Sequence, residues 1–454
     1  MPSPEDPTLR INASPSKEFF IHMLTRDVQL TKAIIDLVDN CVDGAKRLNG
    51  DSRFDGLWVR IQLSSTSFSI TDNCGGIPVD TARNYAFRFG RPKKAEETPN
   101  SVGLFGVGMK RTFFKLGNQF KVNSTCKTEG FTMSVNVMDW IGAEEDADNP
   151  EGWHFNFDTL ETDLPENPDR EVGTAITVSD LHPAVAETFQ LENFRSQLIL
   201  ELRSTHSLSI QQGLGITVNH VPVTLQSHNL FVSAEFKPSM KEFEYPREQI
   251  DGQRGSPVYV KLLAGLATRN LPDGGWYVFC NGRMVLNADK TEVSIWGRTH
   301  EMRQYHPDFA YFRGYAFFDS EHSALLPWTT TKNGVDSDSP LYKRVQLEMI
   351  EVSKPVIAFL SEWAKQRYET EISDDMLDTA LTRAQAVEVA TMGTPTTFAV
   401  SFQPRPQAGP RVQRIQYFKP YDDVEKAKTL LKVKSLKEVG ERTFDYYMEY
   451  EGGS

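Results

Sequence analysis

The stretch that decides the fold is Asp36-Leu-Val-Asp39-Asn40-Cys-Val-Asp43-Gly-Ala, inside a segment whose apolar residues have helical spacing. At 3.6 residues per turn, Asp36, Asn40 and Asp43 lie on one face of the predicted helix. Two carboxylates and an amide on one face could bind a cation or a polar ligand. They could equally be an ordinary solvated helix face, and the run alone leaves both open.

The next motif is Ile70-Thr-Asp72-Asn-Cys-Gly75-Gly76-Ile77, in which a pair of glycines follows a carboxylate. A predicted strand ends in Asp72, and two glycines then allow a sharp turn and a close approach of a ligand to the backbone. Asp72 could accept a hydrogen bond from an exocyclic amine such as that of adenine. Taken alone, the segment is more typical of a simple Asx or glycine turn.

A second glycine-rich segment runs Gly103-Leu104-Phe105-Gly106-Val107-Gly108-Met-Lys110, and a helix is predicted to begin just after it. Backbone N–H groups at such a helix start bind anions, and Lys110 could add a charge for a phosphate. The segment lacks the Gly-Lys-Ser/Thr ending of a Walker loop and the preceding strand of a Rossmann motif. Farther on, Thr174 enters a predicted strand and could hydrogen-bond both Asp72 and a base.

In this order and spacing, the four elements resemble the GHKL (Bergerat-fold) ATPases, which include gyrase B, the ninety-kilodalton heat-shock chaperone, MutL, MORC proteins and sensor histidine kinases. The resemblance covers residues 17–180 and implies that ATP and Mg²⁺ are the cofactors. It implies Asn40 as the Mg²⁺ ligand and Asp72 as the acceptor for the adenine amine, supported by Thr174. The turn at Gly76 and Ile77 then belongs to the adenine site, and residues 103–108 form the lid over the phosphates. We expect Asp43 to support the site by hydrogen bonding within the fold.

Two positions depart from the family pattern. The family has Glu four residues before the Asn, where it activates the attacking water, whereas this chain has Asp36. Its carboxylate is one methylene shorter, which makes hydrolysis the open step. Cys74 stands where a first glycine is common, but Gly75 and Gly76 remain, so we expect nucleotide binding to survive.

A second predicted domain carries two features of the MutL, MORC and gyrase B relatives. Lys332, in the segment Thr329-Thr-Thr-Lys332-Asn-Gly, resembles the transducer lysine that reaches the γ-phosphate, although a surface lysine would fit the same pattern. Asn281-Gly282 resembles the turn of MutL-type second domains and is also a tight-hairpin signal. Sensor histidine kinases carry a dimerisation helix with a phospho-acceptor histidine before the ATP domain. Only about 30 residues precede the first motif here, which argues against that subfamily. The chaperone reading is weaker than MutL or MORC because a large middle domain is missing.

The predicted fold class is α+β: a Bergerat-type ATP-binding α/β sandwich, a transducer-like α/β domain and a helical C-terminal region. We assign an N-terminal arm (1–16), the ATP-binding domain (17–188), the transducer-like domain (189–340), a helical segment (341–393), a linker (394–410) and a small C-terminal piece (411–454). We expect a mobile loop near 90–102, an insertion or hairpin within 142–172, and a helix break or kink at Pro355. The C-terminal piece is predicted to hold one strand (Val412–Phe418) and two short helices.

Composition narrows the class of protein. The chain has 454 residues, 39% of them hydrophobic, and a formal net charge of -12, which argues against binding nucleic acid through overall charge. Its four cysteines are scattered along the chain, which argues against a disulfide framework and against a zinc site. No secretory signal is recognisable, and no apolar run approaches the roughly 18 residues of a membrane helix. We therefore expect a cytoplasmic protein without a membrane segment.

Two functions remain. The first is a Mg²⁺-dependent ATPase that closes or dimerises on ATP and acts on a partner protein or on DNA. The second is an ATP-gated clamp or scaffold with little or no hydrolysis, which Asp36 favours. The resemblance also implies a homodimer and a partner protein, such as a nuclease, in bacterial anti-phage defence or DNA processing.

Overall fold

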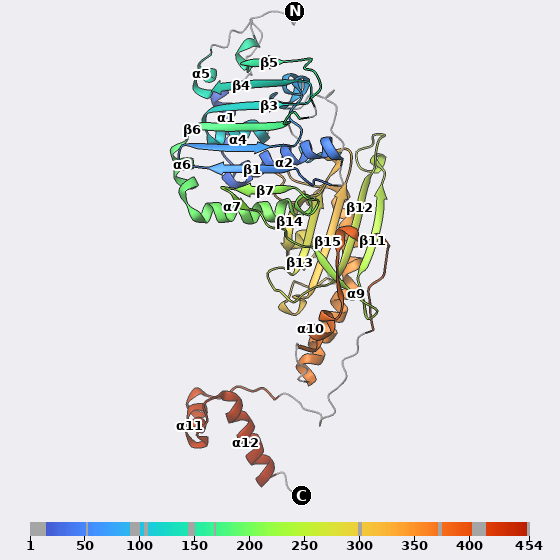
Figure 1. Cartoon of the computed structure of the whole chain (residues 1–454). Coiled ribbons are helices and arrows are strands. Elements are labelled where there is room, and N and C mark those ends of the chain that lie inside the picture. The colour runs from blue at the N-terminus through green and yellow to red at the C-terminus, as the bar shows by residue number, and fades with distance from the viewer. Residues whose placement is uncertain are drawn as a thin grey trace, which may run out of the picture. The chain divides into compact units, whose positions relative to one another are not determined.

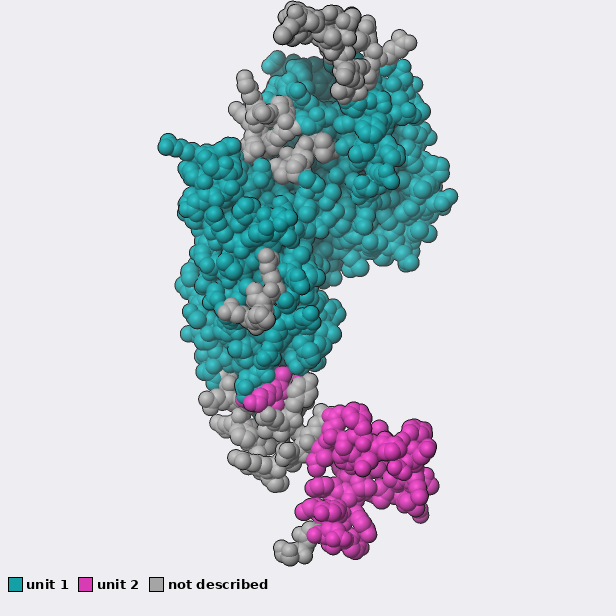
Figure 2. Space-filling model, turned by 180° about the vertical axis from the view of Figure 1, so that it is seen from behind, with its two compact units in different colours: residues 1–362, 375–403 teal, residues 363–374, 404–454 magenta. Residues whose placement is uncertain are grey.

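The computed structural model describes residues 15–50, 53–90, 100–103, 108–143, 150–167, 169–297, 302–370, 375–401 and 415–451. The chain divides into two compact units, coloured separately in Figure 2. The first comprises residues 1–362 with 375–403, and the second comprises residues 363–374 with 404–454. Every candidate site residue lies in the first unit.

An eight-stranded sheet forms the first half of this unit, in the order β5-β4-β3-β6-β2-β1-β7-β8 (Figure 1). Neighbouring strands are antiparallel, except that β1 and β7 run parallel. The strands are β1 (Trp58–Leu63), β2 (Ser67–Asp72), β3 (Gly117–Thr125), β4 (Gly130–Asn136), β5 (Thr159–Glu161), β6 (Gly173–Leu181), β7 (Gly215–Val218) and β8 (Val221–Pro222).

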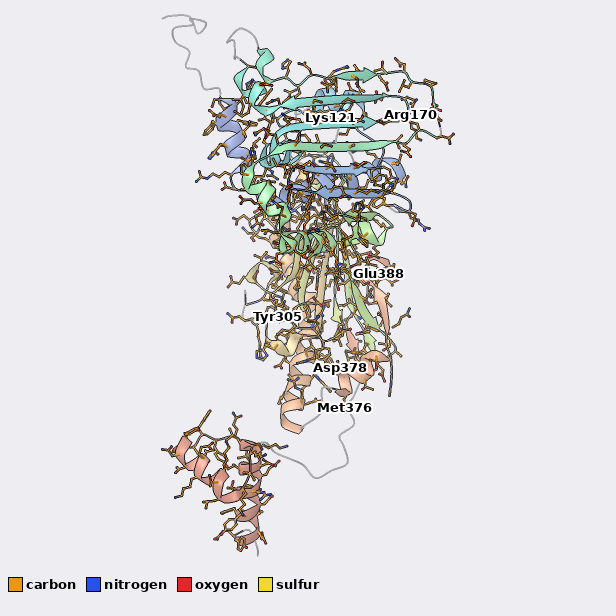
Figure 3. The ribbon with its side chains drawn as sticks, turned by 60° about the vertical axis from the view of Figure 1, so that its left-hand side comes forward. Lys121, Arg170, Tyr305, Met376, Asp378 and Glu388 are labelled. Atoms are coloured by element: carbon orange, nitrogen blue, oxygen red, sulfur yellow. The ribbon has the colours of Figure 1, made fainter. Side chains whose placement is uncertain are left out.

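Helices cover this sheet and bury its apolar residues in one core. Along β3, Phe120 and Val122 are buried in that core, while Lys121, labelled in Figure 3, is exposed. The alternation is that of a sheet with one covered face. The helices of this half are α1 (Lys17–Thr25), α2 (Leu30–Asn49), α3 (Val79–Thr81), a π-helix (Ala82–Ala86), α4 (Gly108–Leu116), α5 (Val137–Gly142), a 3-10 helix (Pro150–Trp153), α6 (Pro183–Gln190), α7 (Glu192–Thr205) and α8 (Ser207–Gln211).

A five-stranded sheet forms the second half, in the order β11-β12-β15-β13-β14. The β13 and β15 strands run parallel, and the other neighbours are antiparallel. The strands are β11 (Ser239–Tyr245), β12 (Val258–Leu266), β13 (Gly275–Cys280), β14 (Arg283–Asp289) and β15 (Phe312–Asp319). Two small strand pairs join this half, β9 (Asn229–Val232) with β16 (Gln385–Glu388) and β10 (Phe236–Lys237) with β17 (Ala399–Val400).

The five-stranded sheet is covered on both faces. On β15, Phe317 packs in a core cluster with Leu208 of α8, whereas its neighbour Phe318 contacts Tyr342. Tyr342 belongs to α9 (Pro340–Thr370), which is followed by α10 (Asp375–Thr382). Since successive strand residues point to opposite faces, the two phenylalanines place a helical layer on each side. This explains why β15 is buried along nearly its whole length.

The structure confirms the α+β class and most predicted elements, with corrections at several positions. The strand at 215–218, which the sequence analysis placed in the second domain, is β7 of the first sheet because it pairs with β1. Helix α9 continues through Pro355 instead of breaking there. Part of the predicted linker, Ala399–Val400, is strand β17.

The described part of the predicted C-terminal piece, residues 415–451, holds two helices, as the sequence predicted, α11 (Tyr421–Leu431) and α12 (Leu436–Tyr450). A capping box starts α12, in which Ser435 and Glu438 satisfy each other's backbone amides. The predicted strand Val412–Phe418 is wrong at 415–418, which has no regular structure, and 412–414 lies outside the described residues.

Candidate functional site

Helix α2 carries the predicted polar face next to a fully buried apolar one. Asp36 and Asp43 are buried, and Asn40 between them is exposed. The run of Ile34, Ile35, Leu37 and Val38 packs in the core of the first sheet and fixes the rotation of the helix. The three polar side chains therefore lie along one edge of a well-anchored helix.

Asp43 binds the start of the glycine-rich segment. Its Oδ1 and Oδ2 accept the backbone N–H groups of Val102 and Gly103, each at 2.7 Å. Burial raises the pKa of Asp43, and the Lys46 ammonium and the two amide bonds oppose that shift. A Cβ at position 103 would come within 3.0 Å of Asp43 Oδ2 and 3.8 Å of Asn40 Oδ1. The glycine therefore permits this backbone to lie directly over the polar face of α2.

Asp36 forms an ion pair with Arg111, which was not among the predicted site residues. The carboxylate also lies beside the first residue of α4, because a Cβ at Gly108 would meet Asp36 Cβ and Oδ2 at 3.3 Å. Arg111 Nε is buried and has no hydrogen-bond partner among the described residues. The start of α4 thus places a cation on the carboxylate whose side chain is one methylene shorter than the family's Glu.

Lys110 does not lie where the phosphate hypothesis requires. Its side chain is buried, and Nζ donates to the carbonyl oxygen of Ala86 at 2.7 Å. Burial lowers the pKa of Lys110 to about 7. A lysine in this position supports the π-helix at Ala82–Ala86 and does not present a point charge above α2.

Asp72 lies at the end of β2, in register with Thr174 of β6. Its Oδ1 accepts the Cys74 amide at 2.8 Å, and its Oδ2 lies 3.3 Å from Cys41 Sγ on α2. Burial raises the pKa of Asp72, against the lowering effect of these bonds and of the Thr174 backbone. A carboxylate held in this way between strand and helix is suited to accept one further hydrogen bond from a ligand amine.

The turn after Asp72 has the geometry that the glycines predicted. Gly75 and Gly76 have φ values of 97° and 74°, which only glycine adopts at little cost. A Cβ at Gly76 would lie 2.4 Å from the Thr125 carbonyl oxygen. Ile77 is then held on β3, because its amide donates to Ser124 Oγ at 2.7 Å.

Asp39, quoted in the run but not assigned a role, is the centre of a buried charge cluster. Its carboxylate receives Arg283 Nε and Lys332 Nζ, each at 2.9 Å, and His206 Nε2 lies 3.6 Å away. Burial raises the pKa of Asp39, but the charges of Arg283, Lys332 and His206 outweigh this effect, so the pKa lies below its usual value. Lys332 comes from the second half of the unit, and its partner on α2 is Asp39.

The β13–β14 hairpin ties the glycine-rich segment to the second sheet. Asn281 and Gly282 form its two-residue turn with φ values of 47° and 81°, which confirms the tight-hairpin reading. Asn281 Nδ2 donates to the Ser101 carbonyl oxygen at 3.0 Å. Lys46 Nζ bridges the carbonyl oxygens of Asn100 and Asn281 at 2.8 and 2.9 Å. Residues 100–103 are therefore anchored from α2 and from the hairpin.

Four predicted lid residues, Leu104, Phe105, Gly106 and Val107, lie outside the described residues. So do residues 1–14 of the predicted arm, 91–99 of the predicted mobile loop and 402–410 of the predicted linker.

Helical spacing could have indicated two residues to which the sequence analysis gave no role, Arg111 and Asp39. In the helix that follows Gly108, Lys110 and Phe114 are four residues apart, and Phe114 is apolar, so that face was the one to be buried. Arg111, three residues after Gly108, shares the glycine's face. Asp39 is three residues from Asp36 and borders the polar face. No local pattern could indicate that Arg283 and His206 meet it.

The donor set fits Mg²⁺ bound mainly through substrate oxygens. Asp36 and Asp43 already have partners, so the exposed amide oxygen of Asn40 is the oxygen on this face that remains available to a cation. Mg²⁺ is usually held by one or two protein oxygens together with phosphates and water. Within the described part of the chain, no group of three or more His, Cys, Asp and Glu side chains forms a further metal cluster.

Comparison with known families agrees with this geometry. Residues 28–162 match the family model described as histidine kinase-, DNA gyrase B- and HSP90-like ATPase. The matched range contains α2, the Asp72 turn and the glycine-rich segment, and it identifies this part of the chain as a GHKL-type ATPase domain. Such a domain supports ATP binding and an ATPase type of function. No curated protein matches the chain. In the described part of the chain, no helix is long and apolar enough to span a membrane.

Proposed function

We propose that this protein is a Mg²⁺-dependent ATPase in which ATP drives closure of the two halves of the first unit or dimerisation. The observation that carries the proposal is the placement of two glycines on the polar face of α2. Gly103 lies against Asp43 and Asn40, and Gly108 lies against Asp36. Asp43 holds the amides of Val102 and Gly103, so the donors for phosphate are the first amides of α4, which begins at Gly108 beside Asp36.

The roles of the residues rest on the resemblance to the GHKL ATPases, and their positions are compatible with these roles. Asn40 holds the Mg²⁺ that shields the phosphate charge. Asp72 accepts the amine of adenine, with Thr174 beside it, and the turn at Gly76 and Ile77 borders the base. Asp36 orients or deprotonates the attacking water after Arg111 has moved from it.

Lys332 is the residue that links the two halves. In the described conformation its ammonium is bound by Asp39. The γ-phosphate of ATP competes with Asp39 for this cation, whereas ADP offers no such group. A ligand shifts a conformational equilibrium only through such differential contacts.

A second function is favoured by one specific observation, the Asp36–Arg111 ion pair. A carboxylate oxygen that stays occupied by a guanidinium is not available to position the attacking water. The protein would then be an ATP-gated clamp or scaffold that binds the nucleotide and turns it over slowly or not at all.

Phosphate release under saturating Mg-ATP separates the two functions. We expect turnover in the wild type, loss of turnover in Asp36→Ala and a change in rate in Asp36→Glu, whose longer side chain restores the family length. Asp55→Ala, an exposed carboxylate outside the site, is the matched control. Tight ATP binding without any turnover in the wild type would rule out the ATPase and leave the clamp.

The biological setting is part of the proposal. We propose a cytoplasmic homodimer that acts on a partner protein, such as a nuclease, or on DNA, in bacterial anti-phage defence or DNA processing. The support is the resemblance to MutL and MORC proteins in the order of the motifs and in Lys332. Molecular mass in solution with ADP and with a non-hydrolysable ATP analogue tests the ATP-dependent dimer, and an unchanged monomer mass would contradict it.

A further inference from the structure

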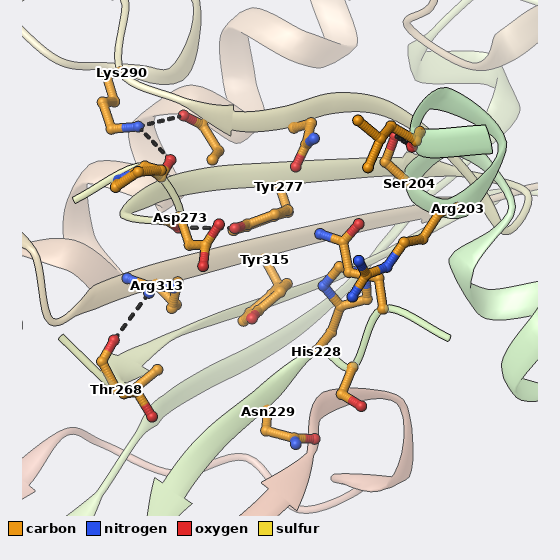
Figure 4. A pocket seen from close by; sticks show the side chains of 17 residues that line it. Arg203, Ser204, His228, Asn229, Thr268, Asp273, Tyr277, Lys290, Arg313 and Tyr315 are labelled. Carbon is orange, nitrogen blue, oxygen red and sulfur yellow. Dashed lines mark hydrogen bonds between the residues drawn. The ribbon is translucent and has the colours of Figure 1, made fainter. Parts of the chain in front are cut away.

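A cavity of the first unit lies away from α2, between α7 and the five-stranded sheet (Figure 4). Its volume is ≈ 740 Å³, within the range of about 300–1,000 Å³ that is typical of small-molecule sites. Arg203 and Ser204 of α7 form one side, and Tyr277, Lys290 and Arg313 belong to the sheet and its loops. Nothing in the proposed nucleotide chemistry uses this cavity.

The cavity is positively charged in a protein of net charge -12. Three cationic side chains line it, Arg203, Lys290 and Arg313, against a single carboxylate, that of Asp273. His228 also lines it, but burial lowers the pKa of His228 to about 4, so it is neutral at pH 7. The local charge balance favours an anion.

Arg313 is a buried cation without an ion pair. Its side chain is 5% exposed, and its guanidinium donates to the backbone carbonyl oxygens of Ala310, Phe312 and Thr268 at 2.8 to 3.0 Å. Within the described residues no carboxylate lies within ion-pair distance of it. Carbonyl oxygens fix the orientation of the guanidinium but leave its net charge uncompensated, and a buried charge is costly without a counter-ion.

Two further donors at the cavity lack partners. Tyr315 is 3% exposed and lines the cavity, and its hydroxyl has no hydrogen-bond partner among the described residues. Burial raises the pKa of Tyr315, so the hydroxyl stays protonated and able to donate. Arg203 Nε is buried and likewise unpartnered within the described part of the chain. Donors are rarely left unsatisfied in protein interiors, and the Tyr315 hydroxyl is one that an acceptor bound in the cavity could satisfy.

The walls that hold these donors are rigid. The rings of Tyr277 and Tyr315 stack with centroids 5.2 Å apart, and His228 packs edge-on against both. Ser207 Oγ holds His228 Nε2 at 2.9 Å, and the Tyr277 hydroxyl donates to the Asp273 carbonyl oxygen at 2.8 Å. The site is therefore preformed, which reduces the ordering cost of binding.

We propose that this cavity is a second ligand site, distinct from the nucleotide site, that binds a small organic anion with at least two carboxylate or phosphate charges. Arg203, Lys290 and Arg313 supply the charge, and the Tyr315 hydroxyl supplies a neutral donor. Carboxylates and phosphates share the acceptor geometry that guanidinium groups recognise.

Calorimetric titration of the full chain tests the proposal with two probes, citrate for carboxylates and pyrophosphate for phosphates. Both are titrated in the presence of saturating ADP, so that the nucleotide site is occupied. We expect one of them to bind, and the stronger probe identifies the anion class. The absence of binding by both probes would overturn the proposal.

Matched variants locate the binding. We expect Arg203→Gln and Tyr315→Phe each to weaken binding about tenfold, or about 1.4 kcal/mol. Because Tyr315→Phe removes only an unpartnered hydroxyl, the fold of that variant is kept. Arg195→Gln is the control, because Arg195 lies on the same helix but pairs with Glu192 outside the cavity. Equal weakening by Arg195→Gln, or unchanged binding in both cavity variants, would place the anion elsewhere and refute the site.

Discussion

Replacing Asp39 with Asn should strongly destabilise the protein. Asp39 is 0% exposed and is the shared counter-ion of Arg283 and Lys332, which are 3% and 8% exposed. An Asn side chain keeps the shape and can accept one hydrogen bond, but it cannot neutralise two buried cations. Removing one partner of a buried ion pair costs about 3–5 kcal/mol. With two cations affected, we expect a loss of about 4–5 kcal/mol, a large share of the roughly 5–15 kcal/mol of a typical fold.

The assay is urea unfolding at pH 7, followed by tryptophan fluorescence and far-ultraviolet circular dichroism. At this pH the contribution of Asp39 is fully present, because a carboxyl whose pKa is lowered by folding stabilises above its unfolded pKa. That contribution is lost only as the pH falls through the folded value. The control is Asp55→Asn, whose exposed pair with Arg53 should change the free energy of unfolding by less than about 1 kcal/mol.

A double-mutant cycle isolates the charge effect from the change of shape. Lys332→Met removes one cation and leaves the Asp39–Arg283 pair intact. In the Asp39→Asn background the same change removes an unpaired buried charge, so the double variant should be more stable than the sum of the single effects predicts, by at least about 1 kcal/mol. A loss below about 1 kcal/mol for Asp39→Asn, or simple additivity in the cycle, would refute the reasoning.

Three further predictions concern a turn, a lysine and a histidine. Gly76→Ala should cost more than the roughly 1–3 kcal/mol of backbone strain, because its Cβ meets Thr125 O at 2.4 Å, while Gly90→Ala, with φ +85 and nothing within 4 Å, should cost the strain alone; equal losses in urea unfolding would contradict the clash. Lys110→Met should leave ATP affinity unchanged. It should also remove the rise in wild-type stability between pH 7 and about 10.5, because folding lowers the pKa of Lys110 to about 7. Weaker ATP binding by the variant would restore the phosphate role. His206→Gln should flatten the fall in wild-type stability between pH 6.5 and 4. Burial lowers the pKa of His206 to about 4, so only the unfolded histidine gains a proton in that window. An unchanged pH profile of stability in the variant would contradict this prediction.

Local sequence patterns were sufficient for α2, for the strand that ends at Asp72 and for the glycine turn after it. Helix α2 was predictable because its apolar residues repeat with helical spacing, and the Asp72 turn because two glycines follow a strand pattern. The pairing of β7 with β1 was not predictable, since Gly215–Val218 reads as a short strand whichever sheet it joins. Only long-range parallel pairing moves it into the first sheet.

The candidate site divides in the same way. The polar face of α2 follows from helical geometry, whereas the partners of its side chains come from distant segments. Lys110 and Arg111 are adjacent, and which of them faces α2 depends on the rotation of α4. The buried Thr112, Phe113 and Leu116 set that rotation in the structure. Composition at the start of α4 does not distinguish the two cations, whereas their helical spacing from Gly108 and Phe114 does.

Helix α2 carries polar side chains on two adjacent sides. Through these side chains, the nucleotide and the second domain can influence each other. Asn40 and Asp43 face the glycine-rich segment, and Asp39 faces Arg283 and Lys332. The β13–β14 hairpin carries Arg283 to Asp39 and, through Asn281, also holds the carbonyl of Ser101. A movement of residues 100–103 therefore acts on the same hairpin that supplies a counter-charge to Asp39. Because a buried ion pair has discrete arrangements and little tolerance for partial separation, withdrawing Lys332 from Asp39 would leave the carboxylate with Arg283 alone and would loosen the contact between the two halves.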